Sequence, residues 1–409
     1  MFNVKLSRKN LPEFVLSLLP FTLFFPVGVM NAGILLFICS LACSGQFAAK
    51  WQRIRRHVLL VPILGLSLVS CLVAVFLPRP AHEFWSGLGH YQTYLFLLLF
   101  ISVGAGRWQQ RAVQVFFVGA IMAASLFYLN ALHVLPFRTP FTSYVLYSGN
   151  KSILLGVLLG IAAGWMLFDL VEKRDRLWLR CAALLYVVFA LVLLSKTRTG
   201  NLIFMLCAGL VVLRYVRLSW RSVLAVLGLC VALGVVWVSA DGLRTRLVGM
   251  VHDVQAFSQG KKISEDGIRL EIYKITTQII LEKPVLGHGV ATWIGEYQQR
   301  AKGLLTAGMT TPHNDYLLYA TEIGVVGLGA LLWIWASQLV WAFRLVRSHQ
   351  SFGRVDDGMR LAMLTVAMML GGMFNAILRD AVFGLAFMLL LAIPLAGLEA
   401  SAKQMPASK

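Results

Sequence analysis

The chain has 409 residues, of which 58% are hydrophobic and only 13% are charged. Soluble domains are about half apolar and about a quarter charged, so this composition excludes a soluble domain and a disordered chain. The net charge of +19 would suggest a nucleic-acid partner for a soluble protein. In a membrane protein, however, basic residues first of all orient the helices. We therefore expect an all-α polytopic membrane protein with no nucleic-acid partner.

Apolar segments that are long enough to cross a bilayer recur along the chain. Such a segment needs roughly 18 residues and must be helical, because lipid offers no partner to open backbone groups. The first segment follows basic residues, but no A-x-A-like cleavage site comes after it, so we expect an uncleaved helix. The sequence predicts about twelve spans, near 11–26, 27–44, 58–77, 91–106, 112–135, 150–171, 181–197, 200–213, 222–240, 315–343, 361–378 and 381–398.

Lys and Arg gather in every second loop. An even number of spans places both termini on one side of the membrane. The loops on that side hold 22 basic residues, and the short loops opposite hold 6. The positive-inside rule assigns the richer side to the cytoplasm. We therefore expect both termini in the cytoplasm and membrane lipids around the basic loops.

One long polar stretch, residues 241–314, interrupts the apolar pattern and is predicted on the outer face. The domain organisation expected is nine transmembrane helices in 1–240, an outward loop domain in 241–314, and helices 10 to 12 with a short cytoplasmic tail in 315–409. Within the loop domain a helix is predicted to begin at Ser264 or Asp266 and to run to about Glu282. Its apolar stripe consists of Ile268, Ile272, Ile275 and Ile279.

The first place suited to chemistry is a short polar break between two apolar segments. It contains Lys196, Thr197, Arg198 and Thr199, followed by Gly200. Two cations and two hydroxyl groups at a membrane edge suit an anion such as a phosphate. The alternative is an ordinary hairpin whose Lys and Arg reach the lipid headgroups. Both interpretations are open on spacing alone.

The second place is Arg269, on the predicted helix of the loop domain. It is offset from the isoleucine stripe by one position, about 100° around the helix, and shares its face with Tyr273. These two side chains can therefore face a site next to the membrane. The alternative is a solvated arginine, or one paired with Glu265 or Glu271.

The third place is the segment from Thr311 to Asn314, just before an apolar segment. Thr311 is predicted to cap the helix and Pro312 to be its first residue, which places His313 in the first turn. The helix dipole there disfavours imidazolium, so His313 should stay neutral and able to accept a proton from a hydroxyl. The alternative is an interfacial histidine that is only hydrogen-bonded in place.

Other polar groups are weaker candidates. His82, Glu83 and His90 share one outward loop, but their spacing matches no standard set of metal ligands. Arg379 and Asp380 form an outward turn that can supply an ion pair beside a site. Outward carboxylate pairs are not evident, so we expect neither a metal nor another cofactor.

As a set, these motifs resemble the O-antigen ligase and polymerase superfamily of bacterial inner-membrane proteins. The resemblance covers about 195–327. It rests on Thr197-Arg198-Thr199-Gly200, Gly267-Ile268-Arg269, Lys283-Pro284-Val285-Leu286-Gly287-His288-Gly289, Pro312-His313-Asn314-Asp315-Tyr316 and Glu322-Ile323-Gly324-Val325-Val326-Gly327.

The resemblance implies a GT-C-like transferase in the bacterial inner membrane, with its active site facing the periplasm. For the ligases it implies undecaprenyl-diphosphate-linked O-antigen as donor and lipid A–core as acceptor. His313, Arg198 and Arg269 are then the expected catalytic residues, and the expected reaction is metal-independent and inverting. Lys196, Thr197, Thr199, Asn314 and Tyr273 are expected to bind substrate.

Three other functions are open. An O-antigen polymerase or an O-oligosaccharyltransferase of the same superfamily would use a similar donor. A twelve-helix transporter or flippase would fit the number of spans, but transporters usually carry ionisable residues in mid-membrane and show repeat symmetry. The predicted span interiors are nearly free of charge. A non-catalytic assembly protein is the remaining possibility.

Overall fold

A computed structural model describes residues 7–77, 80, 84–145, 150–215, 265–348 and 352–398 of the chain. All regular elements in these ranges are helices. They are η1 (Arg8–Asn10), α1 (Leu11–Thr22), α2 (Val27–Cys43), α3 (Phe47–Arg56), α4 (Leu60–Phe76), α5 (Phe84–Tyr91), α6 (Tyr94–Ile101), α7 (Trp108–Ala131), α8 (Thr142–Val145), α9 (Asn150–Glu172), α10 (Leu177–Phe189), the π-helical η2 (Ala190–Leu194), α11 (Arg198–Tyr215), α14 (Glu265–Glu282), α15 (Trp293–Arg300), η3 (Leu305–Gly308), α16 (Asp315–Arg347), α17 (Phe352–Phe374) and α18 (Ala381–Leu395).

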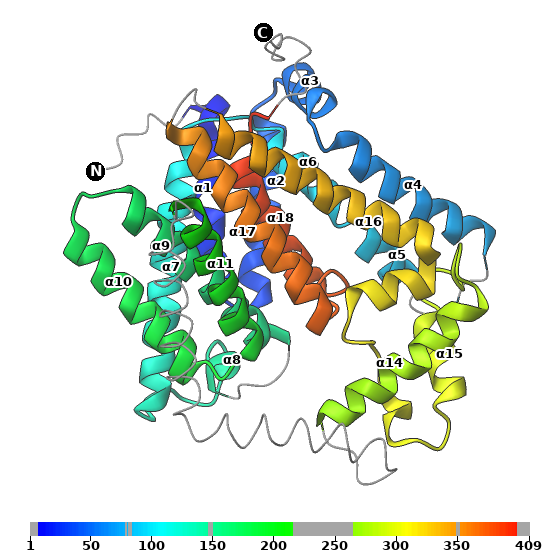
Figure 1. The fold of residues 1–409 in the computed structure, drawn as a ribbon. Helices are drawn as coiled ribbons and strands as arrows, with labels where there is room; N and C mark the ends of the chain where they lie inside the picture. The colour runs from blue at the N-terminus through cyan, green and yellow to red at the C-terminus, as the bar shows by residue number, and fades with distance from the viewer. Residues whose placement is uncertain are drawn as a thin grey trace.

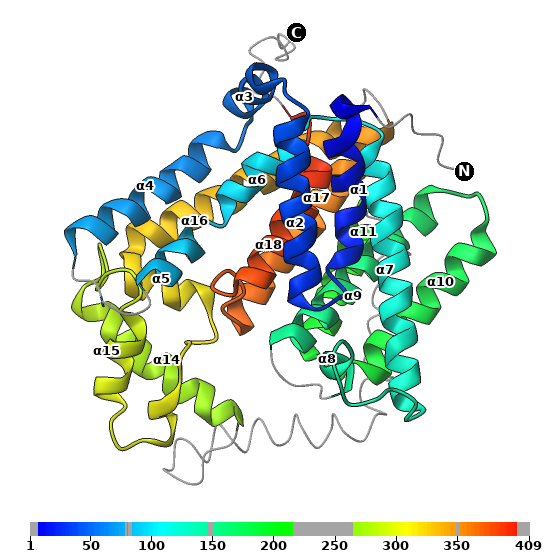
Figure 2. The same ribbon diagram turned by 180° about the vertical axis from the view of Figure 1, so that it is seen from behind.

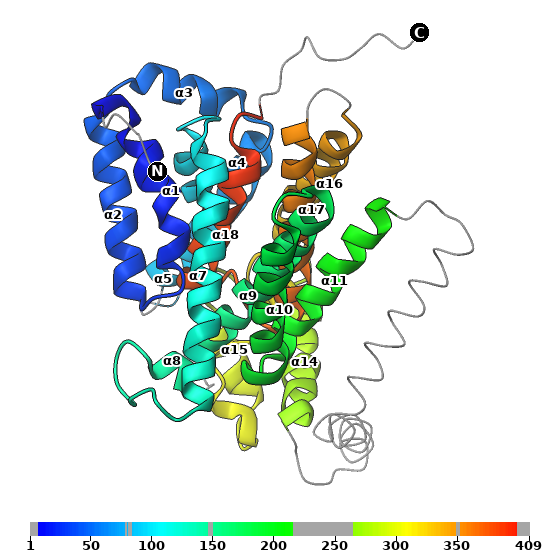
Figure 3. The ribbon, with the colours of Figure 1, turned by 90° about the vertical axis from the view of Figure 1, so that its left-hand side faces the viewer.

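The long helices pack side by side as a bundle around α18 (Figure 1). Helix α18 contacts α1, α6, α7 and α17, and most of its residues are buried. Helices α4 and α16 pack together on one side, while α1, α2 and α7 lie next to one another on the other side (Figure 2). Helices α14 and α15 lie at one end of the bundle and α3 at the opposite end (Figure 3).

The class of all-α polytopic membrane protein is confirmed. Among the described residues, six helices are long and apolar enough to cross a membrane, and α2 with α3 forms one further pair bent by 114°. Helices α4 and α18 are apolar but shorter. The predicted ninth span, 222–240, lies outside the described residues. The figure of about twelve spans therefore stays a prediction.

Two predicted spans differ from the helices that occupy them. Span 91–106 is helical only as α6, because a turn at Gln92 and Thr93 precedes it and Gly104 follows at φ +83°. Span 361–378 is shifted, because α17 begins at Phe352 and takes up charged residues before the apolar segment. The charged residues at the start of α17 can lie inside the bundle because they form ion pairs, such as that of Arg360 with Asp169 of α9.

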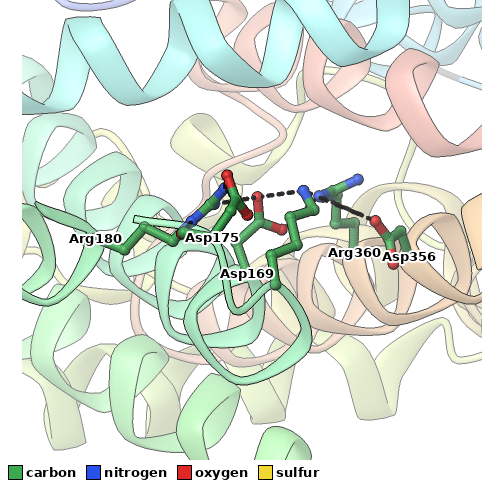
Figure 4. A network of polar contacts seen from close by, with 6 residues as sticks. Asp169, Asp175, Arg180, Asp356 and Arg360 are labelled. Atoms are coloured by element: carbon green, nitrogen blue, oxygen red, sulfur yellow. Dashed lines mark hydrogen bonds and ion pairs between the residues drawn. The ribbon is translucent and has the colours of Figure 1, made fainter. Parts of the chain in front are cut away.

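A buried ionic network joins α9, α10 and α17 (Figure 4). At its centre Arg360 Nη2 lies 2.7 Å from Asp169 Oδ1 and 3.7 Å from Asp356 Oδ2. Lys173 and Arg180 also approach Asp169, at 2.7 and 3.9 Å. Charges that leave water in this way need partners, because an unpaired buried ion is costly. Of these residues only Asp169 lies within a predicted span, 150–171, so the network does not contradict the prediction that the span interiors are nearly free of charge.

The described part of the predicted loop domain, 265–314, has a small core of its own. Helix α14 ends at Glu282 as predicted, and Ile272, Ile275 and Ile279 of its stripe are buried. They pack with Trp293 and Tyr297 of α15, whose rings stack at 4.7 Å. The predicted cap residue Ser264 and the side chain of Asp266 lie outside the described residues.

A backbone clasp, formed by residues 284–289 and 321–326, attaches this domain to the membrane body. Helix α16 is broken at Gly324, where φ is +67°. The amides of His288 and Gly289 donate to the carbonyls of residues 321 and 322, and the amides of residues 325 and 326 donate to those of residues 284 and 285. A Cβ at Gly324 would lie 2.0 Å from the carbonyl oxygen of residue 285. The clasp therefore requires glycine there.

Candidate active site

His313 lies just before α16 rather than in its first turn. The N-cap of α16 is Asn314, whose side chain accepts a hydrogen bond of 3.0 Å from the amide of Leu317. Asn is a stronger N-cap than Thr, so the predicted start at Thr311 and Pro312 was wrong. The Thr311 hydroxyl instead accepts the amide of His313, at 3.3 Å. His313 itself has φ +51°, which turns the chain sharply at this point.

The side chain of His313 lines a cavity of about 350 Å³, here called the chamber. Five parts of the chain meet in its wall: α5, the start of α9, the segment before α16, the turn between α17 and α18, and the start of α18. Its lining residues are His90, Ile153, Thr310, Thr311, His313, Asn375, Ala376, Ile377, Arg379, Asp380, Ala381 and Phe383. Two imidazoles, one guanidinium and one carboxylate thus face a common space.

The surroundings of His313 favour its neutral form. Burial lowers its pKa below the ordinary value of 6.5, and the positive charges of Arg269 and Arg379 lower it further. The sequence argument expected a neutral His313 because of the helix dipole. The direction agrees, but the causes are burial and two arginines. A neutral imidazole can accept a proton from a hydroxyl.

Arg269 and Tyr273 lie on α14, at the side of the chamber. Arg269 is half-buried, and its charge acts on His313. The Tyr273 hydroxyl approaches two carbonyl oxygens, of His313 at 3.3 Å and of Met373 at 3.1 Å. The Asn314 side-chain amide also donates to Met373, at 3.1 Å. Tyr273 and Asn314, both predicted to bind substrate, thus hold the backbone around His313.

The segment that precedes α11 lies beside the chamber rather than in its wall. Arg198 is the first residue of α11 and is exposed, as is Lys196. Thr197 packs against Gly156 of α9, where an added Cβ would meet its hydroxyl oxygen. Gly156 is three residues, roughly one turn, from Ile153 of the chamber wall. The structure thus brings Arg269 and His313 together and leaves Arg198 near the chamber, outside its lining.

Sequence reasoning gave too little weight to Arg379 and none to Asp315. Arg379 lines the chamber and also an adjoining pocket of about 30 Å³, where His90, Tyr91 and Glu322 meet. Asp315 is fully buried and accepts the amide of Leu378 at 3.2 Å. The signal for Arg379 was a charged turn between two apolar segments. Asp315 gave no comparable signal, because an acidic residue in a first helical turn is common.

His90 lies in the chamber wall, a position that the sequence did not predict. It belongs to α5 and lines the chamber together with His313. Burial and the charge of Arg379 lower the pKa of His90 to about 4, although Asp380 opposes that effect. His82 and Glu83, considered with it as metal ligands, lie outside the described residues. The described residues contain no group of three His, Cys, Asp or Glu side chains arranged to hold a metal ion.

A larger cavity than the chamber lies elsewhere in the described part of the chain. It has a volume of about 1020 Å³ and opens between α11, α16 and α17, near Arg214 and Arg347. Its lining is otherwise almost wholly apolar and holds no histidine or carboxylate. The chamber is smaller but combines bases and cations. We therefore take the chamber as the candidate site.

The fold and the chamber define the class: a polytopic helical membrane protein with a cationic, histidine-containing site next to the helices α14 and α16. Residues 182–332 match a protein family described as O-antigen ligase. The matched range contains Arg198, Arg269 and His313, and over this range the chain is similar to that family. A comparison with curated proteins found no match.

Proposed function

We propose that this protein is an O-antigen ligase, which transfers O-antigen polysaccharide from undecaprenyl diphosphate to lipid A–core. The observation that carries this proposal is the position of His313, a neutral imidazole in a chamber flanked by Arg269 and Arg379. The family match supports the same class of reaction. The chamber would face the periplasm of a bacterial inner membrane, with both chain termini in the cytoplasm.

In the proposed reaction, a hydroxyl oxygen of the acceptor attacks the anomeric carbon of the donor sugar. The bond from that carbon to the diphosphate oxygen breaks, and undecaprenyl diphosphate leaves with the electron pair. His313 takes the hydroxyl proton as a general base. General-base catalysis of this kind raises the rate by a factor of roughly 10²–10⁴. Attack from the side opposite the leaving group inverts the anomeric centre.

The leaving diphosphate needs positive charge rather than a proton. Arg269 and Arg198 are proposed to supply it, and a single such electrostatic donor is worth roughly 10²–10³ in rate. Lys196, Thr197 and Thr199 are proposed to bind the substrate next to Arg198. The described contacts of Tyr273 and Asn314 favour a role in holding His313 over direct substrate binding. The proposal requires no metal and no other cofactor.

The test is transfer by purified protein in detergent, with lipid-linked glycan and lipid A–core. We expect product from the wild type, and from His313→Ala a rate lower by roughly 10²–10⁴, because the proton acceptor is gone. His133→Ala is the matched control, since His133 lies in the turn that follows α7 and not in the chamber lining. Normal transfer by the His313 variant would contradict its role as base.

The choice of acceptor decides between members of the superfamily. Lipid A–core as the productive acceptor supports a ligase, whereas a second lipid-linked glycan supports a polymerase, and a protein acceptor supports an O-oligosaccharyltransferase. A transporter would move lipid-linked glycan across a vesicle membrane without forming any new linkage. Each of the three enzymes would form a different product, and a transporter would form none. Assays on one protein preparation can therefore distinguish all four functions.

A further inference from the structure

We propose that Arg379 is a third anion-binding residue of the chamber, held in place by the buried carboxylate of Asp315. The inference rests on the proposed function, because it names the diphosphate of a lipid-linked donor as the anion. It extends that function by assigning a site residue outside the matched range 182–332. It also assigns to Asp315 the task of positioning Arg379.

Arg379 occupies the junction of the two cavities. It faces His313 and Thr311 in the chamber, and His90 and Glu322 in the adjoining pocket. Its guanidinium donates a hydrogen bond to the carbonyl oxygen of Thr310. That bond uses one of the five N–H donors of the group and leaves its fork available to an oxyanion.

The charges around Arg379 favour an anion in the chamber. Arg379 and Arg269 both act on His313 as positive charges. The acidic side chain in the chamber lining is Asp380, and its Oδ1 accepts the amides of Val382 and Phe383 at the start of α18. Lys151 lies close enough to Asp380 to interact with it electrostatically. The cations around the chamber therefore outnumber its carboxylate, as binding of a diphosphate would require.

Asp315 fixes the turn that carries Arg379. Both of its carboxylate oxygens lie 3.2 Å from the amide nitrogen of Leu378, the residue directly before Arg379. Gly372 leaves room for it, because a Cβ there would come within 3.1 Å of Asp315 Oδ2. Asp315 is also two residues from His313. One buried side chain therefore sets the position of the arginine relative to the base, as preorganised sites require.

The direct test is binding of farnesyl diphosphate and of inorganic pyrophosphate to the full-length protein in detergent, measured by calorimetry. We expect Arg379→Gln to weaken binding of both probes by about tenfold or more, because a charge-assisted, two-pronged contact is lost. Arg379→Lys should fall between Gln and the wild type, since it keeps the charge but not the fork. Arg174→Gln, an exposed arginine outside the chamber lining, should bind as the wild type does.

The role of Asp315 is tested by rescue and by a double variant. Asp315→Ala should weaken diphosphate binding, and Asp315→Asn should restore most of that loss because its amide oxygen can still accept the Leu378 amide. If Asp315 acts through Arg379, the variant with both Asp315→Ala and Arg379→Gln binds no more weakly than Arg379→Gln alone. Additive losses would contradict the positioning role.

The outcomes separate this inference from the proposed function. Unchanged diphosphate affinity in Arg379→Gln would overturn the inference, while the function would stand if His313→Ala still abolished transfer. Arg379-dependent diphosphate binding without any glycan transfer by the wild type would contradict the function and support the inference. Should Arg379→Gln fail to fold, unchanged affinity in a folded Arg379→Lys would overturn the inference in the same way.

Discussion

His313 is the residue on which the proposed chemistry depends, and two neighbouring charges tune its protonation. Arg269 and Arg379 come from elements far apart in the sequence, yet both lower its pKa. His90 faces the same chamber, but the charges that act on it are those of Arg379 and Asp380. Both imidazoles are affected by Arg379, but Arg269 is named only among the charges acting on His313, which allows an experiment to tell them apart.

The pH dependence of transfer should identify the base. A base works only when neutral, so the rate falls as the pH drops through the pKa of His313, below its ordinary value of 6.5. In Arg269→Gln one depressing charge is removed, so this acid limb should move to higher pH, whereas Arg174→Gln should leave it in place. Rate profiles of purified variants check this. An acid limb near pH 4 that Arg269→Gln does not move would point to His90 instead.

At the scale of elements, the clasp between residues 284–289 and α16 gives two of the motifs a structural meaning. Their glycines allow close backbone approach, since Gly287 and Gly324 have φ of +72° and +67°. The buried Glu322 completes the joint by accepting the Tyr91 hydroxyl at 2.8 Å and the Ala291 amide at 2.9 Å. These motifs hold α14, and with it Arg269, against the membrane body.

Gly324→Ala should loosen this joint. The substitution costs on the order of 1–3 kcal/mol for the backbone alone, because φ +67° with ψ −172° is a conformation that essentially only glycine adopts, and its Cβ would collide with the Val285 carbonyl oxygen. We expect a lower melting temperature in detergent and faster protease cleavage after Glu282. Gly329→Ala, in the same helix with nothing within 4 Å, is the matched control and should melt no lower than the wild type. Equal melting and cleavage of both variants would refute the clasp.

At the scale of the whole molecule, the features that could be predicted from the sequence are those that hydrophobic periodicity and composition determine. The helical class, the isoleucine face of α14 and its end at Glu282 follow from local pattern and are confirmed. The sequence did not predict which loops meet. The chamber joins α5, α9, the segment before α16 and the turn before α18, so Arg379 and His90 became neighbours of His313 only through tertiary packing.

The misplaced helix start had a local cause that the sequence already contained. Asn314 competes with Thr311 as the cap, and its geometry prevails because its side chain also reaches Met373 of α17. The ionic network of Asp169 and Arg360 is a different case. It could not be predicted from either helix alone, since Asp169 and Arg360 lie far apart in the sequence and come within 2.7 Å of each other only in the folded bundle.

The most direct measurement of the central claim is an experimental structure of the His313→Ala variant with a lipid-linked glycan bound, since loss of the base should preserve the donor. The account predicts the diphosphate in the chamber, between Arg269 and Arg379, with the anomeric carbon facing the vacated position of the imidazole. A diphosphate found in the larger cavity beside Arg214 and Arg347 would contradict it.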